Sequence, residues 1–232
     1  MMLSQLAEEW PRFATYYNLL FIGKAALTTL ALSAAGCILG SLLGLALAIV
    51  RLTSARWLLP LRASAIGFTE LFRRVPFLVT LMLCFFAFQA TGADVPLFVV
   101  AAVTVTLIAA AFLGEIVRGG FNAVHPNQWE AAAAMNFSLL QTIRYVVLPQ
   151  AWRIILPPAF GFFVMFIKDT ALASQIGVVE LTYVGKVLNN KGFSAALSFG
   201  AILLVYFAIS YPLARLGALL ETRLASPRHR PA

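Results

Sequence analysis

Residues 25–50 include no charged residue, and this single run limits what the whole chain can fold into. A helix of about 20 apolar residues crosses the hydrocarbon core of a bilayer. Backbone groups find no water there, so a lone spanning segment must be helical. The chain is 61% hydrophobic and 11% charged, whereas soluble domains carry about 25% charged residues. These features predict a membrane protein with little mass in water.

Four further apolar segments follow the first one. They cover residues 75–90, which we expect to extend back through the amphipathic stretch from residue 61, and residues 95–114, 154–179 and 193–220. The sequence therefore predicts an all-α, polytopic fold with about five transmembrane helices. We divide it into an N-terminal extracytoplasmic segment (1–18), a transmembrane domain (19–225) and a basic, disordered tail (226–232).

Arginine is concentrated on one side of this predicted topology. The connections after the first and third spans and the tail contain Arg51, Arg56, Arg62, Arg73, Arg74, Arg118, Arg144, Arg153, Arg223, Arg228 and Arg230. The opposite side is nearly neutral. Cytoplasmic loops carry the excess of basic residues, so we expect the N-terminus outside and the C-terminus inside. The early acidic pair Glu8 and Glu9, followed by a very long apolar run, does not fit a cleavable signal peptide.

The net charge of +8 does not indicate a nucleic-acid-binding protein. The basic residues stand at the ends of apolar runs instead of forming one patch. Both cysteines, Cys37 and Cys84, lie inside apolar runs, where cysteine behaves as a small hydrophobic residue. Their spacing indicates neither a disulfide framework nor a metal site.

Three glycines recur at every fourth position of the first span: Gly36, Gly40 and Gly44. Small residues at this spacing let two helix backbones approach closely. Two interpretations are open, which are packing inside the helix bundle and contact across a subunit interface.

The predicted cytoplasmic connection, at about 119–153, contains a compact helical pair. Pro126 suits the first position of a helix, where its missing N–H costs nothing. Glu130 lies near the positive end of the helix dipole, and residues 131–134 are alanines, the strongest helix formers. Asn136 tolerates the left-handed conformation that ends helices.

A second helix is predicted directly after this turn. Ser138 and Gln141 have the spacing of a capping box, and we expect the helix to end at Pro149 because proline disrupts a helix interior. Both helices are too short and too polar to span a membrane. The pair is either a docking element for a partner or a connector, although a connector needs only a few residues.

This connection resembles the EAA loop of permease subunits from bacterial ATP-binding-cassette importers. The similarity rests on Glu130-Ala131-Ala132 and on Val146-Val147-Leu148-Pro149, with Asn136 where the family has glycine. Other segments resemble the polar amino-acid branch of that family. These are residues 70–76, 114–120 and 168–174, followed by 176–178 and 180–182, with Arg74-Val75 replacing a commoner Gly-Thr. The resemblance extends from Gly23 to Glu221.

The resemblance implies an inner-membrane subunit that works with several partners. These are a second permease, identical or different, a separate ATPase subunit that binds ATP and Mg²⁺, and an extracytoplasmic binding protein that delivers an amino acid. The chain has no Gly-x-x-x-x-Gly-Lys-Ser/Thr loop, so we expect it to bind no cofactor itself. The resemblance also implies the residues that contact the ATPase: Glu130, Ala131, Ala132, Asn136 and Ser138.

Lys168 and Asp169 are adjacent opposite charges inside the fourth predicted span. Charged residues at this depth cost about 2.5–3.5 kcal/mol on insertion scales and are often functional. One interpretation is a substrate path in which Lys168 meets a carboxylate and Asp169 an ammonium, assisted by Thr170 and Ser174. The alternative is that they neutralise structural partners such as Glu115 or Arg118, or lie near the outer surface.

Two acidic residues each precede an arginine by three positions. Glu70 with Arg73 and Glu115 with Arg118 can pair on one helix face. They are interpreted either as structural ion pairs or as part of an inner gate or of a contact with the ATPase. His125 and His229 have no partners that indicate catalysis, and we expect surface histidines.

Transport driven by a separate ATPase is the function that these patterns favour. A stand-alone secondary transporter or channel is the main alternative, and a second inverted half would mark it. A membrane scaffold would need no charges inside its spans. An enzyme is least favoured because no nucleophile, base and orienting group come together in the sequence.

Overall fold

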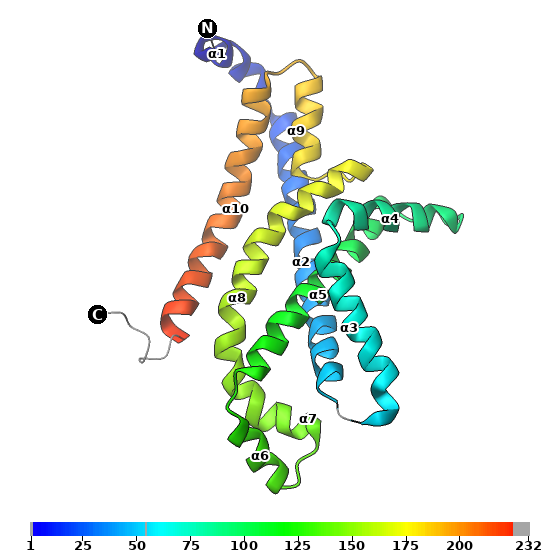
Figure 1. Ribbon diagram of the computed structural model, residues 1–232. Helices are drawn as coiled ribbons and strands as arrows, with labels where there is room; N and C mark the ends of the chain where they lie inside the picture. Colours follow the sequence, from blue (N-terminus) through cyan, green and yellow to red (C-terminus); the bar gives the residue numbers. More distant parts are fainter. Residues whose placement is uncertain (1, 54, 225–232) are drawn as a thin grey trace. The chain divides into compact units, whose positions relative to one another are not determined.

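The computed structural model describes residues 2–53 and 55–224, and within them it is helical with no strand (Figure 1). The α-helices are α1 Met2–Phe13, α2 Tyr16–Leu52, α3 Leu59–Arg74, α4 Phe77–Ala90, α5 Leu97–Asn122, α6 Pro126–Ala134, α7 Leu139–Thr142, α8 Leu148–Asp169, α9 Leu181–Asn190 and α10 Ala195–Leu224. Short 3-10 segments (Arg56–Leu58 and Thr170–Ile176) and a π-helical turn (Ile143–Val147) join some of them. The all-α prediction is confirmed. The tail at 226–232 lies outside the described residues.

Four stretches of helix are long and apolar enough to cross a membrane. They are α2, α5, α10 and the continuous helical segment Leu139–Ile176, which contains α8. The pair of α3 and α4 adds a fifth candidate if it is taken as one span. The chain is therefore a multi-pass membrane protein with four or five spans, in agreement with the predicted number.

The second predicted span is not one continuous helix, which corrects the sequence-based expectation. The segment is bent by 115° between α3 and α4. Val75 is extended at the break, with φ −82° and ψ 133°. The ring of Pro76 causes this, because a residue before proline is driven out of the helical region.

The fourth predicted span changes from α-helix to 3-10 helix near its end. α8 stops at Asp169, and the Thr170–Ile176 segment follows it. Gly177 then takes a left-handed conformation, with φ 93°, which glycine adopts at no steric cost. Glu180 caps α9, a helix that hydropathy alone does not reveal because it is short.

Two compact units divide the chain. Among the described residues, unit 1 comprises 2–35, 77–105 and 165–212, and unit 2 comprises 36–53, 55–76, 106–164 and 213–224. Each unit has its own apolar core. In unit 1, α9 packs beside α2 and α10 around buried Leu181, Val184 and Leu188 (Figure 1). In unit 2, Phe121, Ile143 and Val147 anchor the core.

Two glycines of the first span, Gly40 and Gly44, pack against α5 inside unit 2. A Cβ added to Gly40 would lie 2.5 Å from Cβ of Ala109, and one added to Gly44 would lie 2.7 Å from the backbone nitrogen of Gly114. These two positions support packing inside the bundle and leave no room for a helix from another subunit.

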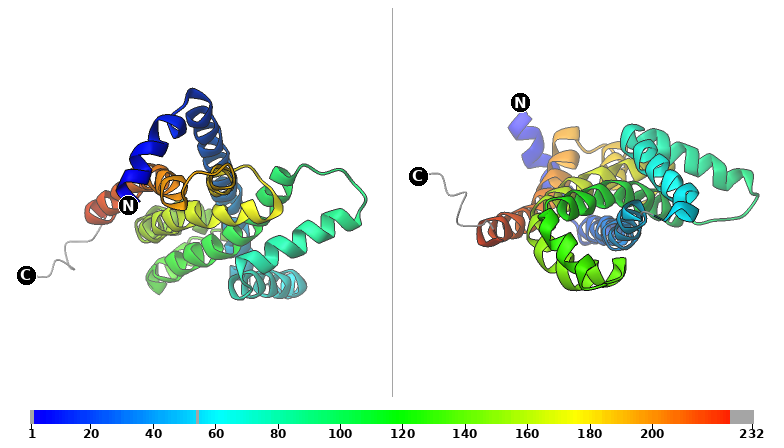
Figure 2. Two further views of the ribbon diagram at one scale, coloured as in Figure 1. Left: turned by 90° about the horizontal axis from the view of Figure 1, so that it is seen from above. Right: turned by 60° about the horizontal axis from the view of Figure 1, so that its bottom comes forward.

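Within unit 1, one carboxylate of the N-terminal helix binds the residue that precedes α10. α1 lies beside the start of α10 in Figures 1 and 2. Glu9 Oε2 accepts hydrogen bonds from the backbone N–H of Ser194, at 2.8 Å, and from its hydroxyl, at 2.7 Å. These donors hold the pKa of the Glu9 carboxyl below its ordinary value.

Candidate functional site

The first helix of the cytoplasmic hairpin begins where the sequence predicts. Pro126 opens α6, and the N–H of Asn127 donates to Nδ1 of His125 at 3.2 Å. His125 is therefore the N-cap residue of α6 and has a structural role that the sequence analysis missed. Histidine is not among the preferred capping residues, so its type gives little signal.

Asn136 makes the turn between the two hairpin helices. Its φ is 59°, the one positive value among the described non-glycine residues. The N–H of Asn136 donates to Ala133 O at 2.9 Å, and that of Phe137 donates to Ala132 O at 3.1 Å. This pair of bonds defines a Schellman motif, which satisfies carbonyl groups at the end of a helix. The predicted left-handed turn is confirmed.

The predicted capping box is also present. The backbone N–H of Ser138 donates to Gln141 Oε1 at 2.8 Å, and the N–H of Gln141 donates to Ser138 Oγ at 3.4 Å. α7 begins at the next residue, Leu139.

The second hairpin helix does not end at Pro149, which corrects the prediction. The chain passes through the π turn Ile143–Val147 directly into α8. The N–H of Leu148 donates to Ile143 O, five residues back. In an α-helix the Pro149 ring would clash with the carbonyl of Tyr145. The wider π turn removes that conflict, so hairpin and span form one continuous element.

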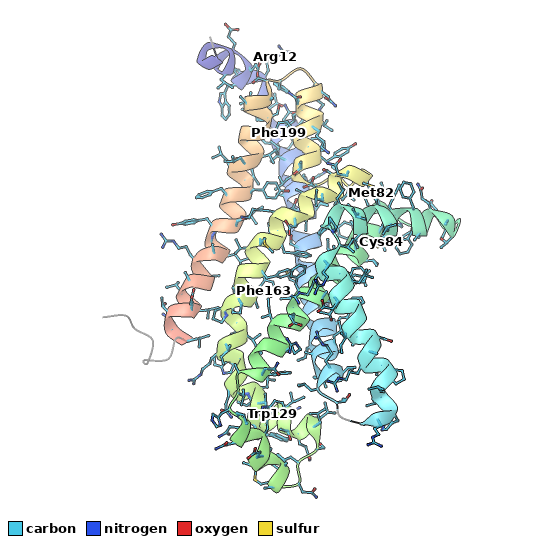
Figure 3. The ribbon with its side chains drawn as sticks, viewed as in Figure 1. Arg12, Met82, Cys84, Trp129, Phe163 and Phe199 are labelled. Atoms are coloured by element: carbon cyan, nitrogen blue, oxygen red, sulfur yellow. The ribbon has the colours of Figure 1, made fainter. Side chains whose placement is uncertain are left out.

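Four of the five predicted docking residues are exposed. These are Glu130, Ala131, Asn136 and Ser138. Ala132 is fully buried within unit 2, so its side chain packs inside the chain, and its contact with an ATPase stays a prediction. It shares the inner face of α6 with Trp129, which packs against the core of that unit (Figure 3).

The outer face of the hairpin also exposes three large apolar side chains. Met135 is 57% exposed, Leu140 65% and Tyr145 63%. Contiguous apolar patches with a polar rim are typical of protein-interaction sites.

One hydrogen bond joins the hairpin to the span. Gln150 at the start of α8 donates to Gln128 of α6 at 3.1 Å.

Glu115 gathers three arginines in unit 2. Its carboxylate lies 2.9 Å from Arg51 and 3.9 Å from Arg73, and it also pairs with Arg118. The Glu115–Arg118 pair forms as its spacing predicts. The Glu70–Arg73 pair does not, because Glu70 binds Arg74, four residues on, at 2.6 Å. Arg73 instead lies over the ring of Phe112 in α5, 5.9 Å from its centroid.

The predicted substrate-path residues do not form one site. Lys168 lines a cavity between α8 and α10, and Asp169 is not among the residues that line it. Thr170 is buried and its hydroxyl donates to Ile167 O in its own helix, at 2.7 Å. Ser174 is buried and accepts a hydrogen bond from Lys186 Nζ at 3.0 Å. The structural partners suggested for this pair, Glu115 and Arg118, bind each other.

A buried carboxylate in unit 1 escaped the sequence analysis. Glu180 is fully buried. It accepts hydrogen bonds from the N–H groups of Thr182, at 3.0 Å, and Tyr183, at 2.8 Å. The hydroxyl of Tyr206 in α10 also donates to it, at 2.8 Å. Burial raises the pKa of Glu180, and the three donors oppose that shift. The sequence signal that could have revealed this residue is its position directly before Leu181, at the N-cap of α9.

Comparison with known proteins gives consistent results. The family model described as "binding-protein-dependent transport system inner membrane component" matches residues 36–226. The glutamine transport system permease protein GlnP of Escherichia coli K12 is 35% identical over 162 residues, covering 69% of this chain and 74% of that protein. A probable amino-acid ABC transporter permease protein of Bacillus subtilis, YckA, is 32% identical over 197 residues, covering 85% and 86%.

Solved structures show the same fold. The crystal structure of an amino acid ABC transporter with histidines has a TM-score of 0.80 and 28% identity, covering 89% of this chain and 95% of that one. The inward-facing MetNI methionine ABC transporter has a TM-score of 0.77 at 20% identity, covering 91% and 100%. On the sequence match, supported by this fold, the chain belongs to the family of inner membrane components of binding-protein-dependent transport systems.

Proposed function

We propose that the chain is the transmembrane subunit of an ATP-driven amino-acid importer, and that the hairpin of α6 and α7 is its contact with a separate ATPase. The observation that carries this proposal is the hairpin itself. α6 is capped at both ends and α7 at its start, polar and apolar side chains are exposed together, and α7 continues through the π turn into a membrane span. A connector would need none of these features.

The hairpin is built to pass a displacement to the membrane. The hydrogen bond between Gln128 and Gln150 joins α6 to α8, and the π turn leaves no flexible loop between α7 and α8. Two states of the ATPase partner would then bias two states of the spans, which is the coupling that alternating access requires.

The remaining partners follow from the family and from the names of its members. The relatives include glutamine and amino-acid permeases, and this chain would carry an amino acid too. It would pair with a second permease, receive substrate from an extracytoplasmic binding protein, and leave ATP and Mg²⁺ to the ATPase. The substrate path would run past Lys168.

Charge reversal at Glu130 tests the docking proposal. The complex would be purified through a tag on this chain and reconstituted in liposomes. Glu130→Lys should leave the amount of inserted protein unchanged but reduce ATP-dependent uptake about tenfold or more, as expected when a charge at an interface is reversed. Glu221→Lys, an exposed glutamate near the end of α10, is the matched control.

Unchanged uptake by Glu130→Lys would show that the hairpin takes no part in coupling the ATPase to transport. Full uptake without nucleotide would instead support a stand-alone transporter.

A further inference from the structure

An apolar groove lies between α1, the start of α2 and the first third of α10, all within unit 1. Its volume is about 740 Å³. The wall from α1 extends from Leu6 to Phe13, and the wall from α10 extends from Ala196 to Val205. Every lining residue is apolar or a glycine, and no transport step described above uses this groove.

The lining does not suit a polar metabolite. Among its residues, the one polar side-chain atom is the indole nitrogen of Trp10. Sites for small molecules combine apolar walls with a few precisely placed polar groups, and this groove lacks such a set. A hydrocarbon chain needs only apolar surface removed from water, so the lining complements a hydrocarbon chain.

The groove has the length of one leaflet of a bilayer. From Ala196 to Val205 it follows α10 over nine residues, or about 14 Å at 1.5 Å per residue. Half of a hydrocarbon core of about 30 Å is about 15 Å. Both α2 and α10 are candidate membrane spans, and the groove lies at their N-terminal ends. Lipid acyl chains are the apolar molecules available at this depth.

α1 has the character of a helix that lies at the membrane surface. Its residues Leu6, Trp10 and Phe13 line the groove, whereas Glu8 and Arg12 are exposed (Figure 3 labels Arg12). Helices divided in this way lie in the interface with their apolar face toward the acyl chains, and tryptophan is enriched at that level. The groove therefore begins where the acyl chain of a lipid begins.

Polar bonds hold α1 beside the groove. Glu9 Oε2 accepts hydrogen bonds from the N–H and the hydroxyl of Ser194, at 2.8 and 2.7 Å, directly before α10. The side chain of Asn18 in α2 donates to Phe13 O at the end of α1, at 3.0 Å. The wall from α1 is thus fixed from two sides before a ligand arrives, which lowers the cost of binding.

Small residues on α10 leave the space that the groove occupies. Ala196, Gly200 and Ala201 lie on the face of α10 that lines it. A Cβ added to Gly200 would have no neighbouring atom within 4 Å. The groove can therefore be filled from this position without a clash.

We propose that this groove holds an acyl chain of a phospholipid from the leaflet at the N-terminal ends of α2 and α10. α1 covers the chain, and the bonds between Glu9 and Ser194 keep α1 in that position. The lipid is then a bound component of unit 1 and not one of the exchanging lipids around the spans. This inference goes beyond the proposed function and does not depend on the solute carried.

Photolabelling of the purified complex tests the proposal. The complex would be reconstituted in vesicles of phosphatidylethanolamine with a trace of the same lipid bearing a diazirine in its acyl chain, washed in detergent and then irradiated. Peptide mapping should place the label on α1 and on residues 196–205. Label spread over all spans in proportion to their exposed apolar surface would contradict a held lipid.

Two glycines give a matched pair of variants. Neither Gly200 nor Gly23 has an atom within 4 Å of an added Cβ, but only Gly200 lines the groove. Gly200→Leu should reduce labelling of α1 and α10 about fivefold or more, because the new side chain takes the place of several chain carbons and their van der Waals contacts. Gly23→Leu should leave the labelling unchanged.

Two neighbouring glutamates test the role of α1. Glu9→Ala removes the acceptor of both bonds from Ser194 and should reduce labelling of α1 and α10 as Gly200→Leu does. Glu8→Ala, at an exposed position in the same helix, should have no effect.

Equal labelling of the two glycine variants would overturn the inference, and so would cross-links from α10 to a second copy of the chain in place of lipid. Either result would leave the proposed function standing, because that proposal is tested by uptake and by the association of an ATPase.

Discussion

Asn136 has the most demanding backbone conformation in the hairpin. The left-handed region costs ordinary L-residues about 1–2 kcal/mol, while glycine and, to a lesser degree, asparagine accept it. Three cues in the sequence, namely the alanine run, Asn136 and Ser138, were enough to predict this turn. Both the turn and its caps depend only on neighbours in the chain, which is why sequence reasoning succeeds here.

Replacement of Asn136 should follow that cost. Asn136→Gly should leave hairpin stability unchanged or slightly raised, whereas Asn136→Val should lower it by about 1–2 kcal/mol. Hydrogen exchange of the Phe137 amide, which donates to Ala132 O, would measure the difference. Equal protection in both variants would show that the turn does not depend on the conformational preference of residue 136.

The arginines around Glu115 show where residue spacing stops being informative. A spacing of three correctly predicts the bond from Arg118, but it wrongly assigns Arg73 to Glu70. Spacing describes neighbours on one helix, and it does not reveal that α2 and α3 bring Arg51 and Arg73 to the same carboxylate.

Two glutamine substitutions compare the ion pairs of Glu115, which binds three arginines, with the single ion pair between Glu70 and Arg74. Glu115→Gln leaves three arginines without their common anion and should destabilise the protein by about 1–3 kcal/mol. Glu70→Gln removes a pair in which Arg74 is 79% exposed, and should cost at most about 0.5–1 kcal/mol. Thermal unfolding in detergent would compare them, and similar losses would contradict a central role for Glu115.

At the scale of elements, the continuity of the hairpin with α8 depends on one π turn. Hydropathy predicts long spans because transfer into a bilayer depends on composition over a window. It does not predict the break before Pro76, the end of α8 at Asp169 or the short helix α9. Those features depend on single residues and on hydrogen bonds between segments far apart in the chain.

Pro149→Ala should let the π turn relax to an ordinary α-helix. That change would rotate the hairpin by about one residue, or 100°, about the axis of α8. Cysteines placed at Gln128 and Gln150, whose side chains hydrogen-bond, should then cross-link more slowly, and uptake should fall. Pro158→Ala, farther along α8, is the control, and equal cross-linking in all variants would show that the turn persists without Pro149.

For the whole molecule, the family and the number of membrane spans agree with the sequence prediction. The orientation of the chain, with its N-terminus outside and its C-terminus inside, stays a prediction. The arginine distribution favours a cytoplasmic hairpin and an external C-terminal end of α9. Gln141 and Asn190 are both exposed and mark these two parts.

Single cysteines at these positions give a direct test of orientation. In intact inner-membrane vesicles of right-side-out polarity, an impermeant maleimide should label Asn190→Cys and leave Gln141→Cys unlabelled. Inverted vesicles should give the opposite result. Labelling of Gln141→Cys from outside would show that the topology is the opposite one. The hairpin could then not contact an ATPase in the cytoplasm.

The glycine contacts between α2 and α5 have a mechanical consequence. An added methyl at position 40 or 44 would lie within 3 Å of the neighbouring helix, so the two backbones interlock with no free volume for sliding. In unit 2, these parts of α2 and α5 therefore form one rigid helix pair. Any movement within unit 2 must therefore take place at other contacts.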